Sequence, residues 1–153
     1  MEMRLEIVVL PVSDAGRAKA FYASMGWRVD ADALSEDLHF VRMTPPGSHC
    51  SIVFGEGVSA ALPGTAQGLV LSVTDIEASR ADLRSRGIDV SEIFHDDGGV
   101  FTHYDPQHRM PGLDSRRRSS ASFASFTDPD GNTWLLQESI PSIFTSGFSA
   151  PPA

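Results

Sequence analysis

Two stretches of the sequence decide the fold, because VSDAGRAKAFYASMGWRV at residues 12–29 and VTDIEASRADLRSRGIDV at residues 73–90 repeat each other. Each opens on a valine and, two positions later, an aspartate. In each, a glycine follows that aspartate by 12 residues, at positions 14 to 26 and 75 to 87. Internal similarity at a fixed spacing is typical of a duplicated structural unit. The sequence therefore predicts two matched modules that share an interface.

Each copy is predicted to contain four strands. The first strand is an apolar, β-branched run whose length and composition favour a strand over a helix. Three further short runs follow the repeated stretch and are separated by turn-forming residues. The predicted strands are residues 7–10, 28–32, 38–43 and 51–54 in the first copy and residues 69–73, 89–94, 121–126 and 133–138 in the second.

A helix is predicted after the first strand of each copy. In the second copy, Thr74 opens a capping box that closes on Glu77, in which the threonine side chain accepts a backbone N–H. In the first copy, Asp14 offers the same oxygen chemistry. Gly26 and Gly87 stand where a helix commonly ends on a residue in the left-handed conformation.

These elements predict an α+β fold of two tandem βαβββ modules, with helices on one face of a mixed sheet. The first module spans residues 1–58, and a linker rich in proline, glycine and alanine spans residues 59–66. The second module spans residues 67–140 and contains a long loop at residues 95–120. Residues 141–153 are expected to be a loose tail.

Composition excludes several classes of protein. The chain has 153 residues, 41% of them hydrophobic, and a net charge of −8, so we expect one packed domain that repels nucleic-acid phosphates. A single cysteine, Cys50, excludes an internal disulfide and a cysteine-rich zinc site. No apolar run reaches the roughly 20 residues that span a bilayer, and the N-terminus lacks the features of a signal peptide. We therefore expect a cytoplasmic protein without a membrane partner.

The order and spacing of four motifs resemble the vicinal-oxygen-chelate superfamily, which groups glyoxalases, bleomycin-resistance proteins and extradiol dioxygenases. The motifs are Val12-Ser13-Asp14, Ala18-Lys19-Ala20-Phe21-Tyr22, Gly26-Trp27 and Phe126-Thr127-Asp128-Pro129-Asp130-Gly131-Asn132-Thr133-Trp134. The resemblance covers about residues 5–139. It implies that the strands of the paired modules curl into a cup, commonly completed by dimerisation. In the enzymes of the superfamily, a divalent metal in that cup holds two vicinal oxygens of the substrate.

The resemblance also implies where metal ligands would stand. Those positions are Ile7, Ser51, Gly68 and Leu135. Of these four side chains, only the serine hydroxyl can coordinate a divalent metal, and it does so weakly. Such a site requires imidazole or carboxylate ligands. Glu6 and Gln67 lie one residue away, but strand alternation turns neighbouring side chains to opposite faces. We therefore expect no metal cofactor.

The same alternation predicts which side chains line the cup. They are Ile7, Val9, His49, Ser51, Val53, Gly68, Val70, Ser72, Thr133, Leu135 and Gln137. An apolar concave surface with a few polar groups suits a flat organic molecule, although larger side chains could instead fill the cup as core. His49 is a candidate for orienting a ligand or acting as a general base, with a surface histidine beside a turn as the alternative.

The long loop at residues 95–120 is rich in aromatic residues. Phe101, His103 and Tyr104 are candidates for a lid over the cup, with a disordered excursion as the alternative. A relocated metal site is a weaker hypothesis, because loop histidines without a spacing motif are poor evidence. Its ligands would be His95, His103 and His108, with Asp96 or Asp105.

Three functions follow from these residues. The preferred interpretation is a homodimeric binding protein, resembling the antibiotic-resistance branch, that holds a small, partly apolar or aromatic molecule without a metal. The second is a metal-dependent lyase, isomerase or dioxygenase with relocated ligands. The third is a metal-independent enzyme that uses a histidine as acid or base. Because this fold hosts both binders and enzymes, the fold alone does not decide among them.

Overall fold

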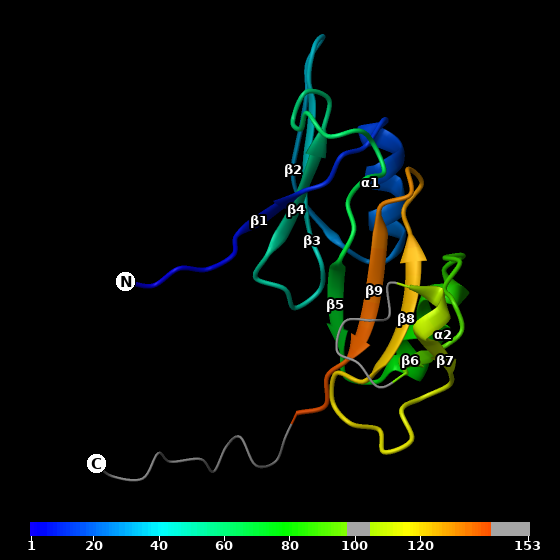
Figure 1. Cartoon of the computed structure of the whole chain (residues 1–153). Helices are drawn as coiled ribbons and strands as arrows, with labels where there is room; N and C mark the ends of the chain where they lie inside the picture. Colours follow the sequence, from blue (N-terminus) through cyan, green and yellow to red (C-terminus); the bar gives the residue numbers. More distant parts are fainter. Residues whose placement is uncertain (98–104, 142–153) are drawn as a thin grey trace.

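The computed structural model describes residues 1–97 and 105–141. They form two separate mixed sheets, of four and five strands, with one long helix packed on each (Figure 1). The α+β class is therefore confirmed, and neither sheet closes on itself. No helix in these two ranges is long and apolar enough to cross a membrane. The predicted tail beyond residue 141 and residues 98–104 of the long loop lie outside the described residues.

The first module has the predicted βαβββ order. Its elements are β1 (Ile7–Val9), α1 (Ala15–Ser24), β2 (Arg28–Leu34), β3 (His39–Thr44) and β4 (Ser51–Gly55). The strands lie in the order β1-β4-β3-β2, with β1 parallel to β4 and the other neighbours antiparallel. The crossover through α1 makes the parallel pairing possible, because two parallel strands cannot be joined by a tight turn.

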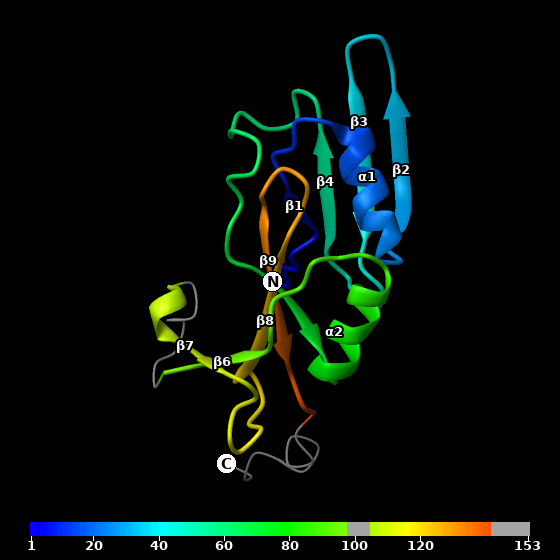
Figure 2. The same ribbon diagram turned by 90° about the vertical axis from the view of Figure 1, so that its right-hand side faces the viewer.

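The second module repeats this topology and adds one strand. Its elements are β5 (Leu69–Val73), α2 (Ile76–Ser85), β6 (Phe94–Asp96), the 3₁₀ helix η1 (Pro106–His108), β7 (Arg109–Pro111), β8 (Ser122–Thr127) and β9 (Thr133–Glu138). The strands lie in the order β5-β9-β8-β6-β7, with β5 parallel to β9. Figure 2 shows β6 and β7 extending from the second sheet on the side away from α2.

Two predictions about the second module need correction. The strand predicted at 89–94 begins only at Phe94, because the residues before it pack as irregular chain, with Val90 buried in the core. The predicted loop at 95–120 also contains regular structure, since β6 pairs with β7 in antiparallel register. Three-residue strands carry too little alternation for a sequence pattern to reveal them.

Aspartate side chains begin both helices. Asp14 accepts a hydrogen bond from the Arg17 backbone N–H, and Asp75 accepts one from Ala78, each at 3.0 Å. The prediction that Thr74 caps α2 is therefore wrong by one residue. Aspartate is at least as good a cap as threonine, and here it occupies the equivalent position in both modules.

The helix ends agree with the prediction. Gly26 and Gly87 follow the last residues of α1 and α2 with φ of +83° and +86°. A side chain at either position would be strained, because L-residues rarely adopt this conformation. Both glycines therefore end their helices in the way that the repeat implied.

One hydrophobic core joins the two modules. The Tyr22 ring of α1 stacks on Trp27 with centroids 4.8 Å apart, and Trp27 meets Trp134 of β9 edge to face at 5.2 Å. Ile52 and Phe54 of β4 and Leu136 of β9 belong to the same buried cluster. Both sheets therefore bury the face that carries their helix in a shared interior.

A buried polar network crosses the same interface. The Trp134 indole donates to the Tyr22 hydroxyl at 2.9 Å, which donates to Asp128 Oδ2 at 2.8 Å. Burial, reinforced by the charge of Asp128, raises the pKa of Tyr22 far above its ordinary value. The Asn132 amide donates to Asp128 and to the Pro11 carbonyl, at 2.8 and 2.9 Å. The turn before β9 thus links the second module to the first.

Candidate binding site

The face of each sheet that lacks a helix, here called the helix-free face, carries most of the predicted cup residues. In the first sheet, Ile7 lies opposite Ser51 and Val9 opposite Val53. In the second sheet, Val70 lies opposite Leu135 and Ser72 opposite Gln137. Directly opposed residues point to the same face, and Ile52 and Leu136, which lie between them on β4 and β9, belong to the core beneath the helices. The register therefore puts these eight side chains on the helix-free faces.

The helix-free faces differ from an ordinary polar sheet surface. Ile7, Val9 and Val70 remain 38%, 41% and 46% exposed, although they are aliphatic residues within strands. Ser51 and Leu135 beside them are buried. Exposed apolar side chains that adjoin one another on a structured face commonly mark an interaction site.

Small polar groups lie at one end of the first helix-free face. Thr44 Oγ1 lies 2.8 Å from Ser51 Oγ and donates to the Asp30 carboxylate. That hydrogen bond, together with the one from Arg28, holds the pKa of Asp30 below its ordinary value. The carboxylate is therefore ionised and can accept a further hydrogen bond at the edge of this face.

On the second helix-free face, sequence reasoning missed an aromatic cluster. Phe94 and Phe123 pack with their ring centroids 5.7 Å apart and form a separate buried cluster with Leu135. The Arg109 guanidinium lies over the Phe94 ring, 4.2 Å from its centroid, and donates to Ser125 Oγ at 3.3 Å. Burial lowers the pKa of Arg109, although it stays charged at neutral pH.

The missed residues had one available signal. Phe123 is the register partner of Gln137, which the alternation of β9 had already assigned to the cup. The turn before β9 could have fixed the register of β8, and hence the orientation of Phe123. No sequence pattern predicts the position of Arg109, because its strand β7 joins the sheet by pairing with the three-residue strand β6.

Two other predicted residues occupy strand ends. His49 lies before β4 rather than in it and is exposed. Gly68 lies just before β5 with φ of +77°. Strand alternation does not extend to a residue outside the strand, so the structure gives no inward orientation for His49.

The loop histidines are not brought together in the described residues. His95 Nδ1 lies 2.9 Å from the Gly112 carbonyl oxygen, and His108 Nε2 lies 4.0 Å from Asp105. Within residues 1–97 and 105–141, no three histidine, cysteine, aspartate or glutamate side chains are grouped closely enough to hold a metal ion. Phe101, His103 and Tyr104, predicted as a lid, lie outside those ranges.

The donors at the expected metal positions do not fit a divalent metal. Ile7 and Ser51 face each other across β1 and β4, and Leu135 is buried beside Val70. Alkyl groups cannot coordinate a cation, and one serine hydroxyl is a poor ligand. We therefore derive no chemistry through a metal at these positions.

Comparison with known proteins identifies the family. A family model of the Glyoxalase/Bleomycin resistance protein/Dioxygenase superfamily matches residues 4–136. The chain belongs to this superfamily. The resemblance drawn from the sequence motifs is thereby confirmed. No protein with a curated description is similar enough in sequence to count as a match.

Solved structures of superfamily proteins share the fold. TnmS3, described as an antibiotic binding protein from Streptomyces sp. CB03234, is 26% identical, with a TM-score of 0.66 over 90% of this chain and 97% of that one. A glyoxalase/bleomycin resistance protein from the same organism is also 26% identical, with a TM-score of 0.63 over 88% of this chain and all of that one. A superfamily member from Sphaerobacter thermophilus DSM 20745, 23% identical, has a TM-score of 0.63 over 90% of this chain and 98% of that chain.

Proposed function

We propose that this protein binds a small, partly apolar or aromatic molecule on its helix-free faces, without a metal centre. The observation that carries the proposal is the exposure of Ile7, Val9 and Val70 on those faces. Apolar side chains that remain in contact with water gain free energy when a ligand covers them, at roughly 25 cal/mol per Å². The similarity to an antibiotic binding protein supports the same class of ligand.

The neighbouring polar groups supply orientation. A ligand that covers Leu135 meets the Phe94–Phe123 cluster, against which an aromatic ring packs well. Ser51 and Thr44 offer hydroxyl groups beside Ile7. A mostly apolar surface with a few hydrogen-bonding groups is the usual composition of a small-molecule site.

We further propose that a second copy of the chain completes the site. Apolar residues alternate along the N-terminal segment at Met1, Met3, Leu5, Ile7 and Val9, and all five are exposed. The segment before β1 runs away from the body of the molecule, on the side opposite both helices (Figure 1). Alternation of this kind is typical of a strand with one buried face, and β1 has a neighbour on only one edge. A partner that packs on this segment would lie beside Ile7 and Val9.

Binding is tested with a neutral fluorescent aromatic probe, N-phenyl-1-naphthylamine. We expect saturable fluorescence enhancement with the wild-type protein and a loss of affinity of about tenfold in Val70→Glu, because a carboxylate replaces apolar surface. The matched control is Val29→Glu, since Val29 is similarly exposed but pairs with Met43 of the buried face. Equal weakening in both variants, or no saturable binding, would contradict the proposal.

A further inference from the structure

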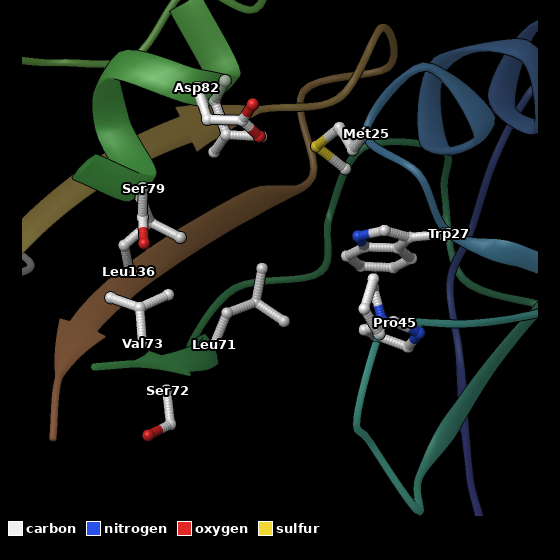
Figure 3. A pocket seen from close by; sticks show the side chains of 11 residues that line it. Met25, Trp27, Pro45, Leu71, Ser72, Val73, Ser79, Asp82 and Leu136 are labelled. Carbon is white, nitrogen blue, oxygen red and sulfur yellow. The ribbon is translucent and has the colours of Figure 1, made fainter. Parts of the chain in front are cut away.

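A separate cavity of about 190 Å³ lies between the two modules, among the side chains of the helix-bearing faces. Met25 and Trp27 of the first module form one wall, and Leu71, Val73 and Leu136 of the second form the other (Figure 3). Ser72 of the candidate binding site also lines this cavity, but the other lining residues lie outside that site, and the proposed function does not use the cavity.

Strand alternation separates most of the cavity lining from the candidate site. Leu71 and Leu136 line the cavity, whereas their chain neighbours Val70 and Leu135 lie on the helix-free face. Successive residues of a strand point to opposite faces. The two sites can therefore be told apart by which of these neighbouring residues responds to a ligand.

The Trp27 indole gives the cavity a rigid aromatic wall. It is only 7% exposed, and its contacts with Tyr22 and Trp134 fix its orientation. The Met25 thioether lies beside it (Figure 3), and thioethers make favourable contacts with aromatic rings. Because an apolar cavity of about 150 Å³ accommodates benzene, this cavity has room for one ring and a small substituent.

Of the polar residues that line the cavity, Ser79 and Asp82 lie on α2, and the Asp82 side chain is 58% exposed to solvent. Ser79 and Asp82 are three residues apart and so share one side of the helix. Asp82 Oδ2 already accepts from Arg86 Nε at 3.0 Å, which offsets its charge and favours a neutral partner over a cation. Among the described residues, the Ser79 hydroxyl makes no hydrogen bond to another side chain or to the backbone. These two residues can therefore donate to and accept from one hydroxyl group.

We propose that this cavity is a second binding site, which takes a neutral molecule of one aromatic ring bearing a hydroxyl group. The ring packs between Trp27 and Leu71. The hydroxyl donates to the Asp82 carboxylate and accepts from the Ser79 hydroxyl. Each part of the ligand is thus matched by a group that already lines the cavity.

The location is tested by titrating the wild-type protein with benzyl alcohol and recording NMR spectra. We expect saturable shifts of the Trp27 indole N–H and of the Leu71 and Leu136 methyl groups, with a dissociation constant on the order of 1 mM for so small a ligand. Shifts confined to Val70 and Leu135 would place the ligand on the helix-free face and overturn the proposal. The absence of saturable shifts would also overturn it.

The chemistry is tested with Ser79→Ala. Loss of one hydrogen bond should weaken benzyl alcohol about 2- to 10-fold. The same variant should weaken benzyl methyl ether by a similar factor, because the ether oxygen also accepts from Ser79, and it should bind toluene, which has no oxygen, as the wild type does. Ser85→Ala is the matched control, because Ser85 lies on the same helix and does not line the cavity. Equal weakening by both substitutions, or an unchanged preference for the alcohol over toluene in Ser79→Ala, would overturn the assignment.

A third variant tests the cavity through its volume. Ser79→Leu extends an apolar side chain from α2 into the space, and leucine is a better helix former than serine. We expect it to abolish binding of both benzyl alcohol and its methyl ether while the protein stays folded. Retention of either ligand at wild-type affinity would show that the cavity is not their site.

Discussion

Ile7 and Ser51 lie directly opposite each other on the parallel strands β1 and β4. These are two of the positions at which the superfamily resemblance implies metal ligands, so the backbone retains the arrangement while the side chains lack the donors. The sheet therefore presents an apolar residue and a hydroxyl where a metal site would need imidazole or carboxylate. This substitution of donors is the physical basis for proposing a binding site without a metal.

We expect the protein, purified without chelators, to contain far less than one divalent metal ion per chain. Elemental mass spectrometry provides the measurement. The double variant Ile7→His, Ser51→Glu serves as the comparison, because it places two competent ligands on directly opposed residues. Stoichiometric zinc, nickel, iron or manganese in the wild type would contradict the prediction and favour ligands outside these positions.

The Tyr22 hydroxyl connects two buried groups, and its removal should destabilise the protein. In Tyr22→Phe, the Trp134 indole N–H loses its acceptor and Asp128 loses a donor. Unsatisfied buried polar groups cost about 1–3 kcal/mol each, so we expect the free energy of unfolding to fall by about that amount. Urea denaturation measures it. Ser24→Ala removes an exposed hydroxyl from the same helix and should change stability by less than about 0.5 kcal/mol.

Buried Glu138 should make stability depend on pH below its ordinary pKa. Its carboxylate accepts from the Arg117 guanidinium at 3.0 and 3.1 Å and from the Ile76 N–H at 2.9 Å. The hydrogen bonds from Arg117 dominate, and they lower the pKa of Glu138 from 4.5. A lowered pKa in the folded state stabilises the protein above pH 4.5, and this contribution is lost as the pH falls through the folded-state value.

Glu138→Gln tests this dependence. We expect a loss of about 1–3 kcal/mol at pH 7 and a smaller difference from wild type at pH 3, both measured by urea denaturation. Glu36→Gln changes an exposed carboxylate and is the matched control. A difference between wild type and Glu138→Gln that stays constant from pH 7 to pH 3 would contradict an ionised role for Glu138.

Local patterns predicted the fold well where the chain alternates or repeats. The strands at 69–73 and 133–138 match β5 and β9 residue for residue, because five or six residues establish a period of two. The contact between Tyr22 and Asp128 could not be predicted in this way. Those residues are 106 positions apart, and no local pattern encodes which modules pack together.

The candidate site was predictable to the same extent. Alternation assigned Val9 and Val70 to the helix-free faces without knowledge of the tertiary structure. It does not extend to His49, which lies just outside β4, or to Arg109, whose position depends on a short hairpin. Alternation thus gives a facing for residues inside a strand, even on the short β1, but none for a residue outside a strand or on a hairpin that the sequence pattern does not predict.

The position of the α2 cap gives a prediction that separates two neighbouring side chains. Asp75 accepts the Ala78 N–H, so Asp75→Ala should lower the free energy of unfolding by about 1 kcal/mol. Thr74→Ala should change it by less than about 0.5 kcal/mol, because the threonine precedes the cap. Thermal and urea denaturation measure both. A larger loss of stability in Thr74→Ala than in Asp75→Ala would show that Thr74 caps the helix, as the capping box predicted from the sequence requires.

The exposed N-terminal segment should hold two copies of the chain together. Leu5 is 71% exposed and precedes β1, so Leu5→Glu leaves the fold of one chain intact but places a charge in the proposed interface. We expect light scattering after size exclusion to give the dimer mass for wild type and a monomer, or a much weaker dimer, for the variant. Leu34→Glu is the control, because Leu34 is 76% exposed at the end of β2. A wild-type protein that is monomeric at all concentrations would contradict the proposed dimer. If only Leu34→Glu dissociates the dimer, the interface lies at β2 and not at the N-terminal segment.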